Sequence, residues 1–149
     1  DELMNIINTN GIKPQHIRLE LTESAIFDDF NMVINNMEKF NKSGIKFYLD
    51  DFGTGYSNLE RIIGCPFYTI KFDKSLLYKS IDNSAVSDIV SHLTSVFKKQ
   101  GFVLLIEGVE NDEQADYSIN KGFDYIQGYK YAKPQPVIKL KDYFNKATA

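Results

Sequence analysis

The segment Asp50-Asp51-Phe52-Gly53-Thr54-Gly55-Tyr56-Ser57 follows directly on the apolar run Ile45 to Leu49. The apolar run has the length and composition of a buried strand, and the glycines after it are typical of a turn. Neighbouring side chains on a regular strand point to opposite faces, so both aspartates can reach one site only if the strand ends or bends there. Gly53 and Gly55 make such a bend easy. The segment therefore predicts a strand with a carboxylate site at its end.

The same pattern recurs along the chain, because other short apolar runs also end in polar residues. In a barrel or an open α/β sheet, the carboxyl ends of the strands carry the chemistry. The predicted strands and the polar residues that follow them are Ile17 to Leu19 with Glu20 and Glu23, Tyr68 to Ile70 with Lys71 and Asp73, Val103 to Ile106 with Glu107 and Glu110, and Tyr125 to Ile126 with Gln127.

Helical patterns fill the intervals between these strands. The alternation of helix and strand favours a parallel sheet with right-handed helical crossovers, within one structural unit covering residues 1–149. The predicted helices are Leu3 to Asn8, one from Asp28 or Asp29 to near Gly44, Ser57 to Ile63, one from Asp82 or Ser84 to near Gly101, one from Asn111 or Asp112 to Gly122, and Leu140 to Lys146.

Composition limits the class of protein. A chain of 149 residues with 43% hydrophobic and 25% charged residues is typical of one globular domain. The net charge of -3 argues against duplex nucleic acid as a partner. The single cysteine, Cys65, excludes an internal disulfide. No apolar run approaches the length of a membrane span, so we expect a cytoplasmic segment without membrane contact of its own, either alone or in a membrane-anchored parent.

The residues at the strand ends suggest a metal site. Carboxylate oxygens from Glu20, Asp50, Asp51 and Glu107 would meet above one end of the sheet, and Mg²⁺ or Mn²⁺ prefers such ligands. A carboxylate that bridges two cations is a common device for holding a water beside a phosphodiester. The adjacent aspartates are the natural bridging pair.

Three further residues suggest catalysis and substrate binding. Lys71 lies among apolar residues, so it requires acidic neighbours, and it could orient a nucleophilic water. Glu107 or Glu110 could accept the proton from that water. Gln127 could hold a water or a substrate oxygen.

Each of these residues also has a purely structural interpretation. Glu23 could belong to the first turn of a helix, Lys71 and Asp73 could form a salt bridge, Glu110 could be a surface charge, and Gln127 could be a cap. The tyrosines are typical of packing, and His16 and His92 lack metal-ligand spacing. One shared site at the strand ends accounts for all of the polar residues together.

Several longer motifs follow one another along the chain, namely Leu19-Glu20-Leu21-Thr22-Glu23-Ser24, Asp50 to Leu59, Lys71-Phe72-Asp73-Lys74-Ser75, Glu107-Gly108-Val109-Glu110, Gln127-Gly128-Tyr129 and Lys133-Pro134. Together they resemble the EAL domain family over about Ile17 to Pro136. The resemblance implies a bacterial second-messenger phosphodiesterase that hydrolyses cyclic di-GMP to linear pGpG on a modified (β/α)₈ barrel with two Mg²⁺ or Mn²⁺ ions.

The resemblance assigns roles at the metal site. Glu20 resembles a ligand of the first metal, Asp50 the carboxylate shared by both metals, and Asp51 a ligand of the second. Lys71 matches the lysine that contacts the hydrolytic water. Glu107 matches a glutamate that serves the second metal or acts as general base.

The resemblance also implies partners. Glu23 resembles the carboxylate that anchors the loop after the aspartate pair, which links metal binding to dimerisation, so a homodimer is expected. Glu110 and Gln127 match positions that support the substrate and metal-bound waters. A sensor or cyclase domain is expected upstream in the parent.

The Glu-Ala-Leu signature and an Asn motif that supply first-metal ligands are absent from this sequence. A complete barrel takes roughly 250 residues, so this chain would supply about the last five β/α units of an incomplete barrel. We therefore expect the C-terminal part of one EAL-type domain, weak or inactive alone, with an active parent and open strand edges. A silent EAL-like receptor or interaction domain and another metal-dependent α/β hydrolase remain as alternatives.

Overall fold

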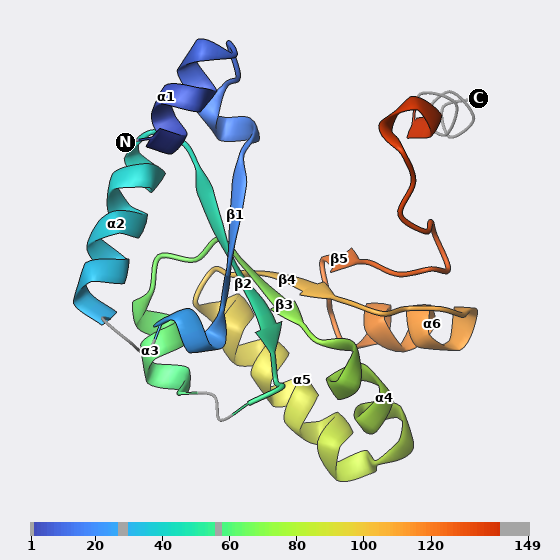
Figure 1. Cartoon of the computed structure of the whole chain (residues 1–149). Helices are drawn as coiled ribbons and strands as arrows, with labels where there is room; N and C mark the ends of the chain where they lie inside the picture. The colour runs from blue at the N-terminus through green and yellow to red at the C-terminus, as the bar shows by residue number, and fades with distance from the viewer. Residues whose placement is uncertain (1, 27–29, 56–57, 141–149) are drawn as a thin grey trace.

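The computed structural model describes residues 2–26, 30–55 and 58–140, and it is an α/β fold with one sheet (Figure 1). In chain order, the elements are α1 (Glu2–Thr9), the 3₁₀ helix η1 (Pro14–His16), β1 (Arg18–Thr22), the 3₁₀ helix η2 (Glu23–Ile26), α2 (Phe30–Lys42), β2 (Lys46–Phe52), α3 (Leu59–Gly64), β3 (Thr69–Phe72), α4 (Lys74–Asp82), α5 (Ser84–Lys99), β4 (Val103–Ile106), α6 (Asp112–Asn120) and β5 (Tyr125–Ile126).

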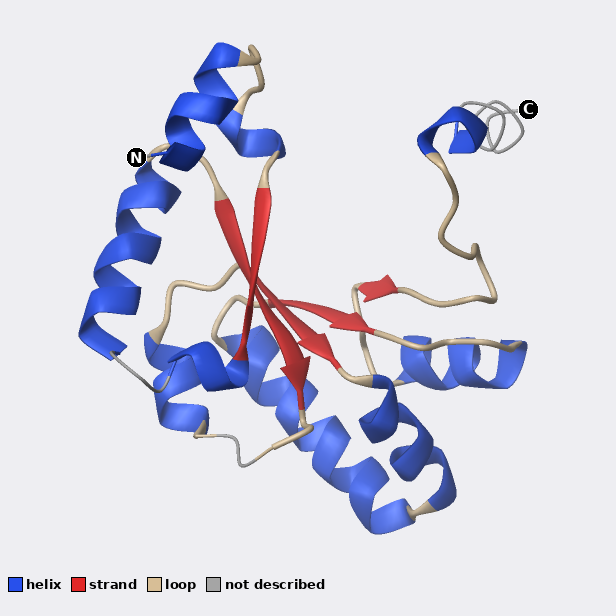
Figure 2. Cartoon of the chain, in the orientation of Figure 1, coloured by secondary structure: helices blue, strands red, loops and turns tan. Residues whose placement is uncertain are grey.

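The sheet is parallel throughout, with the strand order β1-β2-β3-β4-β5. Each strand pairs with its sequence neighbour, and helical crossovers connect them (Figure 2). Because all strands run the same way, their carboxyl ends meet at one edge: Thr22 lies opposite Asp50, and Phe72 lies opposite Ile106. The predicted parallel α/β architecture is confirmed.

The core lies between the sheet and the helices α2 to α6, which run along one side of the strands (Figures 1 and 2). Phe72 is fully buried at its centre and makes edge-to-face contacts with Phe52 and Phe123, at ring-centroid distances of 4.8 and 4.9 Å. Phe97 of α5 packs on Phe52 at 5.3 Å. Such aromatic pairs stabilise a core beyond the area they bury, so the strands that carry the strand-end residues are firmly held.

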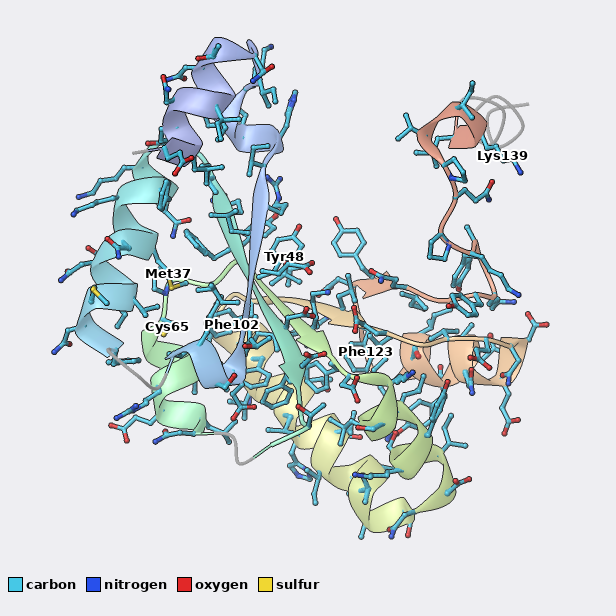
Figure 3. All side chains as sticks on the ribbon, viewed as in Figure 1. Met37, Tyr48, Cys65, Phe102, Phe123 and Lys139 are labelled. Atoms are coloured by element: carbon cyan, nitrogen blue, oxygen red, sulfur yellow. The ribbon has the colours of Figure 1, made fainter. Side chains whose placement is uncertain are left out.

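Alternation along the strands separates a helix-facing side from an opposite side. On β2, Phe47 and Leu49 are buried against the helices, whereas Tyr48 and Asp50 are only partly buried. Figure 3 labels Tyr48 on β2, with Met37 and Cys65 on the helical side. Tyr125 is 60% exposed, so its side chain lies at the surface.

The helix α4 was not predicted from the sequence. Its N-cap is Asp73, whose carboxylate accepts a hydrogen bond from the backbone N–H of Ser75 at 2.8 Å. Since α4 and α5 follow each other directly, two helices connect β3 to β4. Side-chain caps of this kind compensate for unpaired N–H groups at helix starts.

The remaining helices agree with the predictions within a few residues. Asn83 caps α5 and Asn111 caps α6 through side-chain oxygens. The proposed capping residues Asp28 and Asp29 lie outside the described residues, as does the Leu140 to Lys146 helix after its first residue. None of the described helices combines the length and hydrophobicity needed to cross a bilayer.

Candidate functional site

Strand β2 bends at the aspartate pair. The pairing of β2 with β3 is irregular between Leu49 and Phe52, and Asp51 has a left-handed backbone with φ of 55°. An irregularity of this kind turns side chains that would otherwise alternate between faces. As a result, Asp50, Asp51 and Glu107 each place one carboxylate oxygen within 4.8 Å of the others. The expected bend is present, and it is centred on Asp51 itself.

Lys71 of β3 connects three carboxylates: Glu20 within β1, Asp50 near the end of β2, and Glu107 directly after β4. Its ammonium lies 2.7 Å from Asp50, 2.9 Å from Glu107 and 3.1 Å from Glu20. The lysine side chain is only 7% exposed, and Glu20 is the most exposed partner at 47%. We call Lys71, Glu20, Asp50, Asp51 and Glu107 the Lys71 cluster.

The ion pairs keep Lys71 charged. Burial alone would lower the pKa of Lys71, but its hydrogen bonds to Asp50, Glu107 and Glu20 outweigh burial and raise the pKa above its ordinary value. The proposed salt bridge between Lys71 and Asp73 is wrong, because Asp73 caps α4 instead. Burial opposes ionisation of Asp73, yet hydrogen bonds from Ser75 hold its pKa below the ordinary range.

The loop after β4, residues 107–110, carries Glu107 and Glu110. The backbone N–H of Glu107 donates to Phe72 at 3.0 Å, and that of Val109 donates to Gln127 at 3.1 Å. The loop is therefore tied to β3 on one side and to the end of β5 on the other. The side chain of Val109 is fully buried beneath it.

The backbone of residues 127–130 lies in close contact with the backbone of the 107–110 loop. A Cβ atom at Gly128 would overlap the backbone of Val109, so only glycine allows residues 127–130 to approach the 107–110 loop. The backbone N–H of Lys130 donates to the carbonyl of Val109 at 3.1 Å across this contact. The three predicted residues Glu107, Glu110 and Gln127 are thereby brought to one place.

These residues line a pocket of about 530 Å³ beside the Lys71 cluster, which we call the rim pocket. Lys74, Tyr129 and Lys133 also line it, although none was singled out as a site residue from the sequence. The ammonium of Lys133 lies 5.4 Å above the ring of Tyr129. Lys74 follows Asp73, and Lys133 precedes Pro134, within the motifs quoted above. The sequence therefore contained a signal that these two lysines belong to the site.

Glu23 lies elsewhere. It is the first residue of η2, directly after β1, and its side chain is buried. Its position agrees with the first-turn interpretation, and among the described residues it does not belong to the group of three close carboxylates. The loop-anchoring role stays a prediction.

Comparison with protein families decides the assignment. The EAL domain family matches residues 1–134, which is most of the chain. The chain belongs to the EAL domain family. This EAL domain is 34% identical over 142 residues to the cyclic di-GMP phosphodiesterase PdeL of Escherichia coli K12, covering 93% of the chain and 38% of PdeL.

Solved structures share the fold. The EAL domain superposes on the PaMucR phosphodiesterase in complex with c-di-GMP with a TM-score of 0.85 and 28% identity, covering 92% of the chain and 56% of that structure. A manganese and cyclic di-GMP complex of Klebsiella pneumoniae BlrP1 gives a TM-score of 0.81 and 26% identity, covering 89% and 34%. The sheet of this EAL domain therefore corresponds to part of a longer fold.

The chain spans between 16% and 38% of the length of the first curated relatives that it matches. The activity, substrates and partners of the whole protein are therefore proposed below. The donor atoms of Asp50, Asp51 and Glu107 are all carboxylate oxygens, and this set fits a hard divalent cation.

Proposed function

We propose that this EAL domain is the C-terminal part of a phosphodiesterase that hydrolyses cyclic di-GMP to linear pGpG. The observation that carries the proposal is the Lys71 cluster, in which side chains from β1, β2, β3 and the residue after β4 converge. A packed core has no need of three carboxylates paired with one buried lysine and a fourth carboxylate beside them, because burying charges is costly. Their convergence is expected if the site handles cations and phosphate.

In the proposed mechanism, Asp50, Asp51 and Glu107 would hold Mg²⁺ or Mn²⁺, with Glu20 as a further ligand. The complete site would take two ions. Bound divalent cations lower the pKa of a water and neutralise charge on phosphoryl oxygens. The four carboxylates exceed the single charge of Lys71, so the cluster favours added cations.

The side chains of the chain itself have separate tasks. Lys71 stays protonated and would orient the attacking water or stabilise negative charge that develops on the phosphate. Glu107 would accept the proton of that water. Glu110 and Gln127 line the rim pocket and would support the nucleotide.

The chain alone is expected to be weak or inactive. It covers 56% of the PaMucR structure, and the Glu-Ala-Leu and Asn motifs are absent from its sequence. We also propose a cytoplasmic location, a homodimer, and a sensor or cyclase domain upstream in the parent, as expected from the resemblance. The loop that Glu23 is predicted to anchor would link metal binding to dimerisation.

Turnover of cyclic di-GMP by the parent and by this chain, with Mg²⁺, tests the proposal. We expect pGpG from the parent and little from the chain. Lys71→Met in the parent should lower kcat more than it raises KM. Lys98→Met is the matched control, because Lys98 pairs with Asp124 at 2.9 Å on the surface.

The outcomes separate the candidate functions. A parent that hydrolyses nothing would overturn the enzyme proposal. Metal-independent binding of the nucleotide without hydrolysis, measured by calorimetry, would favour the receptor alternative. Turnover of other phosphodiesters in preference to cyclic di-GMP would favour another metal-dependent hydrolase.

A further inference from the structure

Glu107 is followed by a backbone segment that is held on both sides of Gly108. Hydrogen bonds fix the N–H groups of Glu107 and Val109, and Gly108 lies between them with a left-handed φ of 74°. The carbonyl of Gly108 belongs to the peptide between Gly108 and Val109, one peptide beyond Glu107. A contact that holds this carbonyl therefore restrains the backbone next to Glu107.

Helix α4 holds Gly108 at two points. A Cβ atom at Gly108 would overlap Lys74, so the helix and the loop are in close contact. One turn further along α4, the hydroxyl of Tyr78 donates a hydrogen bond to the carbonyl of Gly108 at 3.1 Å. Residues four apart lie on the same face of a helix, so Lys74 and Tyr78 act on the glycine together.

The surroundings of Tyr78 keep its hydroxyl a donor. Burial raises the pKa of Tyr78, and the negative charge of Glu110 raises it further. The hydroxyl therefore keeps its proton at neutral pH and can donate a hydrogen bond to the carbonyl of Gly108. The same tyrosine thus lies close to Gly108 and to Glu110, the last residue of the loop.

We propose that Tyr78 is a positioning residue, which fixes the Gly108 carbonyl and so directs Glu107 toward Asp50 and Asp51. The inference rests on the proposed function, in which these carboxylates hold a divalent cation. Loss of one such hydrogen bond should weaken Mn²⁺ binding about threefold to tenfold, because small displacements of site groups have large effects.

Tyr78→Phe tests the inference, since it removes the hydroxyl and keeps the ring. Tyr117→Phe is the matched control: the hydroxyl of Tyr117 contacts Ser87 at 3.1 Å, also partly buried, and joins α6 to α5 away from the loop. Two measurements are made on the whole chain. Amide hydrogen exchange at Glu107 and Val109 is followed without metal, and Mn²⁺ affinity is measured by calorimetry.

We expect Tyr78→Phe to speed exchange at Glu107 and Val109 and to weaken Mn²⁺ binding, while Tyr117→Phe changes neither. Unchanged exchange in Tyr78→Phe overturns the inference, whether or not Mn²⁺ binds. Faster exchange with unchanged Mn²⁺ affinity also overturns it, because the contact would then be structural only. If the unsubstituted chain binds no Mn²⁺, the metal part of the proposed function fails, and the inference that rests on it fails with it.

Discussion

Replacing Lys71 by Met leaves the carboxylates of the Lys71 cluster facing one another without their cation. Removing one partner of a buried ion pair costs about 3–5 kcal/mol. Here Glu20, Asp50 and Glu107 are between 20% and 47% exposed, so water screens part of that penalty. We expect a loss of about 2–3 kcal/mol, which corresponds to about 5–10 °C in Tm for a domain of this size.

Thermal unfolding of Lys71→Met without divalent ions measures this loss. Added Mn²⁺ should raise Tm more in the variant than in the unsubstituted chain, because the ion replaces the missing positive charge. Lys98→Met serves as the control, and its exposed ion pair with Asp124 should contribute about 1 kcal/mol or less. A Tm for Lys71→Met equal to that of the control, or no recovery with Mn²⁺, would refute the electrostatic reasoning.

The pH dependence of this difference has a definite sign. Folding raises the pKa of Lys71, so its stabilising contribution is fully present below the unfolded pKa of about 10.4 and is lost as pH rises through the higher folded value. The Tm difference between Lys71→Met and the unsubstituted chain should therefore stay constant between about pH 6 and about pH 9. A difference that disappears within this window would contradict the assignment of a protonated lysine.

Three further perturbations test separate parts of the structure. Asp50→Asn should abolish Mn²⁺ binding in calorimetry and change Tm little, since the loss of one carboxylate relieves repulsion; an unfolded variant would make Asp50 structural. Gly128→Ala should lower the free energy of unfolding in urea by at least about 2 kcal/mol, because its Cβ would overlap Val109, whereas Gly55→Ala has open space and should cost little; equal effects would refute the close approach. Burial raises the pKa of Cys65 to about 11, so a thiol reagent at neutral pH should label it only after unfolding, and rapid labelling of the folded chain would be inconsistent with its burial.

The strands were predictable because each one carries a short apolar run with polar residues directly after it. The predicted Val103 to Ile106 and Tyr125 to Ile126 agree with β4 and β5 residue for residue. For β1 and β2, the strands continue past the apolar run into Glu20 and Asp50. Hydrogen bonding to a neighbouring strand does not require an apolar side chain, so composition alone places the strand end too early.

Helix α4 was not predicted, although the sequence contains a signal for its start. Asp73 and Lys74 stand beside Lys71 in the sequence, and their charges suggested site chemistry. In the structure Asp73 is an N-cap, and Leu77 is buried on the core side of the helix that follows. An Asp followed by an amphipathic segment is a helix start, and this signal was available.

The gathering of carboxylates around Lys71 follows from sheet topology and was accessible from the sequence. The contact between Tyr78 and Gly108 was not, because it joins residues thirty positions apart and Tyr78 lies on α4, a helix that was not predicted from the sequence. The roles of Glu110 and Gln127 stay predictions. Their side chains share the rim pocket.

The left-handed backbone of Asp51 matters to anyone who wishes to transplant this proposed metal-binding motif into another protein. Two aspartates grafted onto a straight strand would present their carboxylates to opposite faces. The graft must include the kink and a neighbouring strand that tolerates its offset pairing. Substituting Glu for Asp51 would conserve charge yet favour extended backbone, since Asp accepts left-handed angles better than most residues. The backbone shape at this position is therefore as much a requirement as its acidity.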